Sequence, residues 1–256
     1  MKKLMFATIA LVAAAGAASA ADMPAPVYKA PPPVVAPFYN WTGFYVGAHL
    51  GYGWDTEHAS VAGMSGMGGM GTAMVGMGIP SYDANGVLGG LQAGYNYQMG
   101  SWVFGLEGEV AWTNMSGASN WVTNGNSGTL STDVRWLDTV AGRVGYAFDR
   151  TLVYAKGGAA WESADYGHTM TGGMNHSLSG DATRTGWLVG VGIEHAFWQN
   201  LSVKLEYNYI DFGSANITTA DGAGTSATFN IHQRVNILKA GFNYRFGGEG
   251  PVLAKY

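Results

Sequence analysis

The sequence predicts an all-β protein that folds as an eight-stranded antiparallel up-and-down transmembrane β-barrel. From residue 41 onward, apolar residues alternate with glycine and polar residues in eight segments, which is the period of a strand with two unlike faces. Charged residues make up 12% of the chain, against ~25% in an ordinary soluble protein, and glycine contributes 40 of 256 residues. So few charges argue against a soluble enzyme, and 47% hydrophobic residues argue against a disordered chain.

The N-terminus predicts export. Lys2 and Lys3 precede a short apolar run, and Ala18-Ser19-Ala20 fits the small-residue rule for cleavage, so residues 1–20 are expected to be a signal peptide. The apolar run is too short to span a bilayer as a helix. Residues 21–40 hold six of the eight prolines and are expected to form a semi-rigid periplasmic linker outside the fold.

The barrel is expected over residues 41–246, followed by a periplasmic C-terminal tail at 247–256. Each alternating segment is long enough for the ~9–11 residues that a tilted membrane strand needs. Aromatic residues such as Trp102 and Trp112 lie at the ends of the apolar faces, which is typical of the two aromatic girdles of a membrane barrel. In chain order the segments are residues 43–52, 87–98, 102–113, 136–148, 153–162, 186–197, 201–209 and 237–246.

The connections between these segments alternate in length. Short turns near residues 99–101, 149–150 and 198–200 are expected on the periplasmic side, and an even strand number puts both chain ends there. Residues 61–79 are uncharged, but their seven glycines disfavour a membrane helix, so a flexible external loop is expected. All four long gaps are expected to be external loops: residues 55–85, 116–133, 163–183 and 213–227.

The apolar faces are expected to meet lipid. The alternative is a soluble, lipocalin-like barrel with its apolar face inward, which would need a more highly charged coat than this chain provides. Two residues on the apolar faces break the pattern, namely Asp138, beside Trp136, and His195, near a short turn. Either both lie near a membrane interface or a bulge shifts the phase locally, and the sequence leaves both explanations open.

The opposite faces carry a balanced set of charges. An eight-stranded barrel has an interior that side chains just fill, and buried charges must be paired. The pattern therefore favours a crosslinked polar plug, with lumen glycines making room for long side chains. The alternative is a narrow ion or solute path lined by the same charges. The predicted lumen charge network consists of Glu107, Glu109, Arg143, Lys156, Glu162, Glu194, Lys204, Glu206, Lys239 and Arg245.

Two clusters in the expected loops are candidate sites for copper or haem. Thioethers are soft ligands that suit Cu(I), and paired histidines and methionines can hold copper or ligate haem. The simpler interpretation of both is a loop with incidental residues, so no cofactor is expected. The methionine cluster consists of Met64, Met67, Met70, Met74 and Met77, and the histidine–methionine cluster consists of His168, Met170, Met174 and His176.

The sequence gives little support for an enzyme. His49 with Glu107 or Glu109 could form a general-base pair, but a hydrogen-bonded lumen histidine is the simpler interpretation. The sequence contains no G-x-S-x-G, Walker or H-E-x-x-H motif. A net charge of −4 argues against nucleic-acid binding, and the absence of cysteine excludes disulfides and cysteine-ligated metals.

Four short motifs carry a resemblance to a known family. They are Ala21-Asp22-Met23-Pro24, Trp41-Thr42-Gly43-Phe44-Tyr45-Val46-Gly47, Gly142-Arg143-Val144-Gly145-Tyr146-Ala147 and Asn243-Tyr244-Arg245-Phe246. On these residues the chain resembles the small alphaproteobacterial outer-membrane β-barrel proteins of the porin-like superfamily, the 25-kDa outer-membrane immunogenic type. The resemblance implies a surface-exposed barrel that supports envelope integrity, and some relatives are credited with haem binding or adhesion. Outer-membrane proteins usually end on an aromatic residue, which here is displaced inward to Phe246.

The predicted function is that of a non-enzymatic, integral outer-membrane barrel with a structural, envelope-integrity and surface-interaction role. The alternative is a narrow porin or a ligand-capture protein for haem, metal or small solutes. The expected partners are outer-membrane lipid, lipopolysaccharide, the barrel-assembly machinery and, through the loops, host or surface ligands, but no nucleic acid.

Overall fold

The computed structural model describes residues 39–66, 75–76, 78–123, 126–171, 176–221 and 224–246, which belong to one compact unit, Pro37–Tyr256. The expected signal peptide at 1–20, the expected linker up to residue 38 and the expected tail at 247–256 lie outside the described residues. Within the described part of the chain, no helix is long and apolar enough to cross a membrane.

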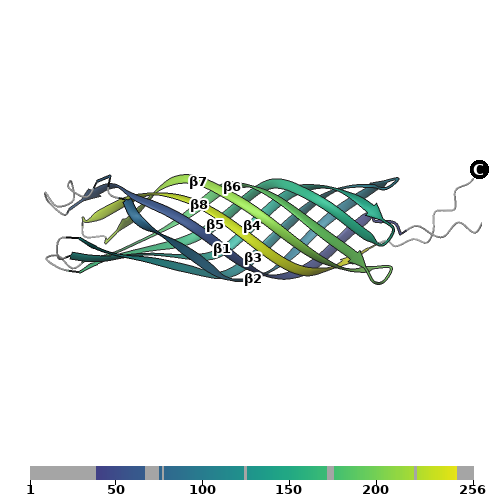
Figure 1. The fold of residues 1–256 in the computed structure, drawn as a ribbon, viewed down its shortest axis with the longest axis horizontal. Coiled ribbons are helices and arrows are strands. Elements are labelled where there is room, and N and C mark those ends of the chain that lie inside the picture. Colours follow the sequence, from purple (N-terminus) through teal and green to yellow (C-terminus); the bar gives the residue numbers. More distant parts are fainter. Residues whose placement is uncertain are drawn as a thin grey trace, which may run out of the picture. The chain divides into compact units, whose positions relative to one another are not determined.

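Eight antiparallel strands close into a barrel in which each strand pairs with its sequence neighbours and β8 returns to β1 (Figure 1). The closing pair runs from Tyr45 opposite Arg245 to Ser65 opposite Ser226. This confirms the predicted fold class. The strands are β1 (Gly43–Ser65), β2 (Gly78–Met99), β3 (Trp102–Thr123), β4 (Asn126–Phe148), β5 (Thr151–Thr171), β6 (His176–Ala196), β7 (Leu201–Ala220) and β8 (Ser226–Arg245).

An apolar belt on the outer surface marks the membrane-spanning segments. Along β1, for example, Phe44, Leu50 and Trp54 all face outward and are exposed. Aromatic residues bound the belt on both sides, as the two interfaces of a membrane barrel require. The girdle away from the short turns, here named the outer girdle, consists of Trp54, Trp112, Trp136, Trp161, Trp187 and Tyr209.

The strands do not end at the outer girdle. They are 20 to 23 residues long, and the part beyond the girdle is named the external extension after the side on which it is expected. It comprises residues 55–65 of β1, 78–86 of β2, 113–123 of β3, 126–135 of β4, 162–171 of β5, 176–186 of β6, 210–220 of β7 and 226–235 of β8.

The prediction of four long external loops is therefore wrong, because most of each gap is paired strand. Ser60 lies opposite Gly78 across the first gap, and Ser127 lies opposite Thr171 near the far ends of β4 and β5. Of the stretch 61–79, the residues up to Ser65 belong to β1 and the residues from Gly78 onward belong to β2.

The apolar pattern inverts at the outer girdle, which explains the error. On β8, Leu238 and Phe242 face outward, whereas Phe229 and Ile231 face inward and are buried. Outside the membrane, water surrounds the barrel, so burying apolar side chains inside it is favourable. The external extension thus has its apolar face inward, which is the arrangement of the lipocalin-like alternative for the whole chain. The outward-apolar alternation stops at the girdle, so the sequence pattern predicts loops beyond it.

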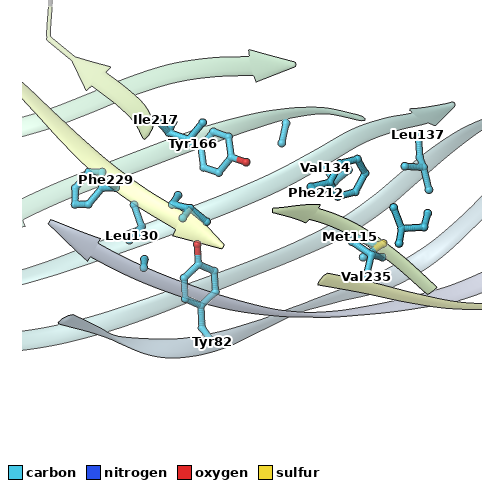
Figure 2. Packing of buried hydrophobic residues seen from close by; sticks show 14 of the residues in the cluster. Tyr82, Met115, Leu130, Val134, Leu137, Tyr166, Phe212, Ile217, Phe229 and Val235 are labelled. Carbon is cyan, nitrogen blue, oxygen red and sulfur yellow. The ribbon is translucent and has the colours of Figure 1, made fainter. Parts of the chain in front are cut away.

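An apolar core lines the interior of the external extension and continues past the outer girdle to Leu137 and Leu188 (Figure 2). Leu130, Leu178 and Phe229 are at most 1% exposed. In Figure 2, Phe229 and Leu130 lie at one end of the cluster, Met115 lies toward the other, and Tyr82 lies between them. Full burial of such a side chain contributes roughly 1.5–3 kcal/mol, so this core stabilises the extension.

The two exceptions on the lipid-facing surface both lie near an interface. Asp138 lies two residues from Trp136 of the outer girdle, next to a register shift between Val134 and Trp136. His195 lies opposite Thr151, beside the β4–β5 turn, and its Nδ1 is 2.9 Å from the Thr151 hydroxyl. Asp138 still faces outward, because it pairs with the outward-facing Val110, so the nearby bulge does not remove it from the surface.

The last residues before β1 close the barrel at its short-turn end, which is named the periplasmic mouth after the side on which it is expected. Tyr39 and Trp41 are 8% and 2% exposed, and their rings meet edge to face at 4.9 Å. Trp41 Nε1 donates to the Asp149 carbonyl at 3.1 Å, and the Tyr39 hydroxyl donates to the Gln199 carbonyl at 3.2 Å. Tyr39, which belongs to the predicted linker at 21–40, is thus packed in this mouth, where burial stabilises its aromatic ring.

Candidate functional site

The membrane-spanning part of the lumen contains a network of paired charges. Strand alternation turns Glu107 and Glu109 of β3 to the same inner face, because residues two apart on a strand share a face. Facing strands supply the partners, and every member is at most 6% exposed. Eight of the ten predicted residues meet here, namely Glu107, Glu109, Arg143, Lys156, Glu194, Lys204, Glu206 and Lys239.

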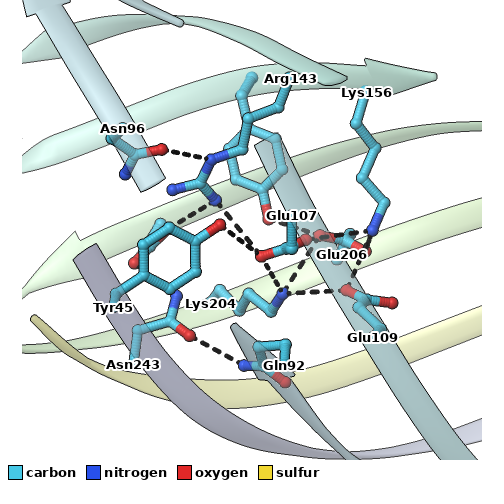
Figure 3. Close-up of polar contacts among 12 residues, drawn as sticks. Tyr45, Gln92, Asn96, Glu107, Glu109, Arg143, Lys156, Lys204, Glu206 and Asn243 are labelled. Atoms are coloured by element: carbon cyan, nitrogen blue, oxygen red, sulfur yellow. Dashed lines mark hydrogen bonds and ion pairs between the residues drawn. The ribbon is translucent and has the colours of Figure 1, made fainter. Parts of the chain in front are cut away.

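The centre of the network joins lysines of β5 and β7 to glutamates of β3 and β7 (Figure 3). Lys156 Nζ lies 2.7 Å from Glu206 Oε1 and 3.0 Å from Glu109 Oε1. Lys204 Nζ lies 3.1 Å from Glu107 Oε2 and 3.3 Å from Glu109 Oε1. Each ammonium group therefore contacts more than one carboxylate.

An arginine extends the network toward the periplasmic side. Arg143 NH1 lies 3.3 Å from Glu194 Oε2 and 3.7 Å from Glu107 Oε2, and Arg143 Nε donates to Asn96 Oδ1 at 2.9 Å. The guanidinium lies over the ring of Tyr45 at 4.8 Å, and the Tyr45 hydroxyl donates to Glu107 Oε2 at 2.9 Å. Arg143 is thus held by ion pairs and by an aromatic face.

Neutral side chains satisfy the remaining carboxylate oxygens. The Tyr154 hydroxyl donates to Glu206 Oε2 at 2.6 Å. Glu194 Oε1 accepts from Ser202 at 2.5 Å and from Asn243 at 2.8 Å. Sequence reasoning did not single out these residues, although each lies on the inner face by alternation.

The network is electrically balanced, with four acids and four bases. Oxygens of Glu107, Glu109 and Glu206 lie within 4.8 Å of one another, which is close enough to hold a cation. Ammonium groups already contact all three, since Lys239 pairs with Glu109 and Glu206 and the other two lysines pair with all three glutamates. The arrangement can therefore crosslink the lumen and close it.

Glu162 and Arg245 lie apart from this network. Glu162 is six positions beyond Lys156 on β5, in the external extension, where its Oε2 accepts from Gln233 at 3.3 Å. Arg245 lies at the periplasmic mouth, with its guanidinium over the Tyr39 ring at 4.4 Å. Both residues lie too far along their strands to reach the centre of the network. The inward-facing pattern shows which face a residue is on, but it does not show its position along the barrel.

Comparison with known proteins assigns the family. A family model described as "Outer membrane protein beta-barrel domain" matches residues 7–246. The chain belongs to this family. It is 32% identical over 251 residues to the 31 kDa outer-membrane immunogenic protein of Brucella melitensis, covering 96% of this chain and 100% of the relative. It is 28% identical over 248 residues to the 25 kDa outer-membrane immunogenic protein of Brucella abortus, covering 96% and 99%.

Among solved structures, the outer membrane protease OmpT from Escherichia coli matches with a TM-score of 0.48 and 10% sequence identity, covering 80% of this chain and 97% of that chain. The family match and the Brucella relatives confirm the predicted family and the predicted location as an integral protein of the outer membrane.

In this outer-membrane barrel, the histidine–methionine pair of β5 lies in the core and not in a loop. His168 and Met170 face inward and are 1% and 6% exposed. The His168 ring stacks on Trp121 at 6.3 Å and meets Phe229 at 5.0 Å, and neither of its nitrogens has a hydrogen-bond partner among the described residues. Burial lowers the pKa of His168 to about 4, so the ring is neutral at pH 7.

The rest of both candidate clusters is largely outside the described residues. Met64 lies on β1, partly buried against the apolar core of the extension. The copper and haem hypotheses thus have no assembled ligand set within the described part of the chain. Positions outside the description are Met67, Met70, Met74, Met77 and Met174, together with the side chain of His176.

His49 is a hydrogen-bonded lumen residue. Its Nδ1 lies 2.6 Å from Gln92 Oε1, and Gln92 Nε2 donates onward to Asn243 Oδ1 at 2.8 Å. The carboxylates of Glu107 and Glu109, with which a general-base pair was considered, contact lysines. The geometry therefore favours a packing role for His49.

A second polar group lies in the interior of the external extension, and of its members the sequence analysis identifies only Glu162. Its members are at most 4% exposed. Continuing the alternation of β1 past the outer girdle would have placed two acids on the inner face. This group, named the external acid layer, consists of Asp55, Glu57, Glu162, Arg184 and Gln233.

Proposed function

We propose that this outer-membrane barrel is a non-enzymatic, non-conducting protein with a structural role in the envelope and a surface-interaction role at its external end. The filled lumen carries this proposal. Paired charges occupy the membrane-spanning part, an apolar core occupies the external extension, and Tyr39 and Trp41 close the periplasmic mouth. A narrow porin would need a continuous wet path through all three layers.

The proposed partners follow from the two outer surfaces. The apolar belt with its girdles suits contact with outer-membrane lipid, after insertion by the barrel-assembly machinery. Beyond the belt, polar side chains pair across strands and face outward. Asn230 Nδ2 donates to Asn216 Oδ1 at 2.9 Å, and the hydroxyl oxygens of Thr218 and Thr228 are also 2.9 Å apart. That height suits contact with lipopolysaccharide and with host or surface ligands, and the Brucella relatives are named immunogenic.

Deletion of the gene tests the structural role. The deletion strain should become more sensitive to detergents and to large antibiotics, while uptake of small hydrophilic solutes stays unchanged. The wild-type gene should restore resistance. A strain that shows normal detergent resistance but slower solute uptake would instead support the porin alternative and contradict the proposal.

A further inference from the structure

The external acid layer is unbalanced in charge, unlike the network in the membrane. It contains three carboxyl groups, those of Asp55, Glu57 and Glu162, and a single guanidinium, that of Arg184. If all were ionised, two negative charges would remain uncompensated inside a closed barrel. Burying an unpaired carboxylate is very costly, so the excess must be neutralised.

The guanidinium of this layer contacts neutral acceptors. Arg184 NH1 donates to Gln233 Oε1 at 2.7 Å. Arg184 NH2 donates to the carbonyls of Gly213 at 2.8 Å and Ile231 at 3.2 Å. No salt bridge within 4.0 Å joins Arg184 to a carboxylate of the described residues.

The three carboxyl groups differ in their hydrogen-bond donors. Glu57 Oε2 accepts from the Tyr82 hydroxyl at 2.5 Å and from the Thr132 hydroxyl at 3.2 Å. Asp55 accepts the backbone N–H of Arg234 on Oδ1 at 3.3 Å and has a side-chain hydrogen bond with Gln233, which Glu162 also uses. Glu162 Oε2 accepts only the Gln233 amide among the described residues. Glu57 is therefore the carboxyl group best suited to carry the negative charge.

Polar atoms inside the layer remain without partners. Asp55 Oδ2, Glu57 Oε1 and Glu162 Oε1 are buried and accept no hydrogen bond from the described residues. The hydroxyl of Tyr166, four positions beyond Glu162 on the inner face of β5, also has no geometric hydrogen-bond partner, although this side chain is 1% exposed. Arg184 Nε is unpartnered too. Such atoms in a native interior call for a ligand, and the smallest that neutralises an acid is a proton.

The titratable side chains in and around this layer come from four strands. β1 contributes Asp55 and Glu57, β2 contributes Tyr82, β5 contributes Glu162 and Tyr166, and β6 contributes Arg184. From the described residues of β3, β4, β7 and β8, the inward side chains at this height are uncharged, such as Thr132 and Gln233.

We propose that the external acid layer is a proton-binding site, in which Asp55 and Glu162 are protonated at neutral pH and Glu57 carries the charge opposite Arg184. Alkaline pH ionises the two bound acids and loosens the external extension. This inference does not depend on the proposed function, because it concerns the external end of the barrel alone.

The electrostatics of the layer agree with this assignment. Burial, together with repulsion from Glu57, raises the pKa of Asp55 to about 8. Burial raises the pKa of Glu162 to about 8 against the pull of Arg184. An unfolded carboxyl group titrates near ~4. The folded pKa of each carboxyl group lies above the unfolded one. The stability that the two bound protons give to the external extension is therefore fully present in acid, and it is lost as the pH rises from about 4 to about 8.

Infrared spectroscopy of the full chain in lipid vesicles detects the bound protons directly. Protonated carboxyl groups have a C=O band apart from the carboxylate bands. We expect this band at pH 6 and its loss as the pH rises through about 8. Asp55→Asn and Glu162→Gln should each remove part of it, whereas Asp181→Asn, an exposed acid on the outer face of β6, should leave it unchanged.

A wild-type spectrum without the band at pH 6, or a band that neither variant alters, would overturn the proposal. The wild-type titration decides the matter even if a variant fails to fold. Hydrogen exchange supplies a second measurement. After correction for intrinsic exchange, opening of the extension should increase up to about tenfold per pH unit for each carboxyl group below pH 8.

After the same correction for intrinsic exchange, opening of the extension in the double variant Asp55→Asn, Glu162→Gln should be nearly independent of pH over the same range. An equal pH slope in wild type and double variant would contradict the proposal. Protection that is independent of pH but falls when EDTA is added would also contradict it, because a metal cation would then neutralise the layer.

Discussion

Lys156 Nζ lies 2.7 Å from Glu206 Oε1, although the two residues come from β5 and β7 with β6 between them. The inner face of β6 makes this contact possible, because it carries glycine at this height. A Cβ at Gly192 would lie 2.5 Å from the ring of Tyr154, and a Cβ at Gly190 would lie 2.1 Å from Asn208 Oδ1. Glycines of one strand thus give long side chains of its neighbours the room to pair across it.

Glu107→Ala tests the charge network. The change leaves Lys156, Lys204 and Arg143 short of a partner in a dry interior. Removing one member of a buried pair costs about 3–5 kcal/mol, so the temperature of the heat-induced gel shift should fall clearly. Asp181→Asn on the outer surface is the control and should leave that temperature unchanged. Unchanged stability of Glu107→Ala would contradict the network.

Ala240→Arg tests which face of β8 meets lipid. Ala240 lies on the outward face between Leu238 and Phe242. A cationic side chain at the middle of the bilayer costs about 2–4 kcal/mol, so folded protein in the outer membrane should be lost. Ala240→Leu keeps the position apolar and should assemble normally. A normal yield of Ala240→Arg in outer-membrane fractions would reverse the assignment of faces.

Gly241, next to Ala240, faces the lumen, and the structure shows whether this position can accept a larger side chain. Sequence reasoning treats Gly241 as a lumen site that accepts serine. In the structure a Cβ at Gly241 would lie 2.7 Å from the Ala48 carbonyl oxygen and 3.0 Å from His49 Cβ. Because the backbones approach so closely there, we expect Gly241→Ser to lower the yield of folded protein, contrary to the expectation from the sequence.

His168→Phe tests the copper and haem hypotheses for β5. The ring lies between Trp121 and Phe229 and has unpartnered nitrogens, so a phenyl ring of similar shape should maintain or raise the thermal stability. Titration of purified protein with Cu(I) or haem should give the same result for variant and wild type. Binding by wild type that disappears in the variant would establish a ligand role instead.

Single cysteines test the orientation of the barrel, since the chain contains no cysteine. On intact cells, a membrane-impermeant maleimide should label Thr218→Cys, which is exposed on the external extension. It should not label Arg150→Cys in the short β4–β5 turn. Breaking the cells should make Arg150→Cys reactive. The opposite labelling pattern would invert the topology.

The sequence predicts the membrane-spanning half of this protein well. Lipid imposes an outward-apolar alternation, so residues such as Phe44, Leu50 and Trp112 identify their own face. It also predicts inward charges, because alternation places Glu107 and Lys156 opposite the lipid face. The position of each residue along the barrel axis is harder to predict from the sequence. For this reason Glu162 and Arg245 were assigned to a network that neither residue reaches.

The external extension escapes sequence reasoning for a physical reason. Its strands bury apolar residues inside and show polar residues to water, so Phe229 and Leu178 occupy the face that is polar in the membrane. A change of solvent along a continuous strand reverses the pattern without any break in the chain. The same reversal explains why the sequence pattern does not identify Asp55 and Glu57 as inward-facing, because both follow the last girdle residue of β1.

Single-channel recording in planar bilayers tests the central claim, that the lumen is closed, most directly. Wild-type protein inserted from detergent should give no steady conductance, because paired charges, an apolar core and the Tyr39–Trp41 mouth block every level of the lumen. A steady, ion-selective conductance that changes with Lys156→Gln would show that the charges line a path, and it would contradict the account.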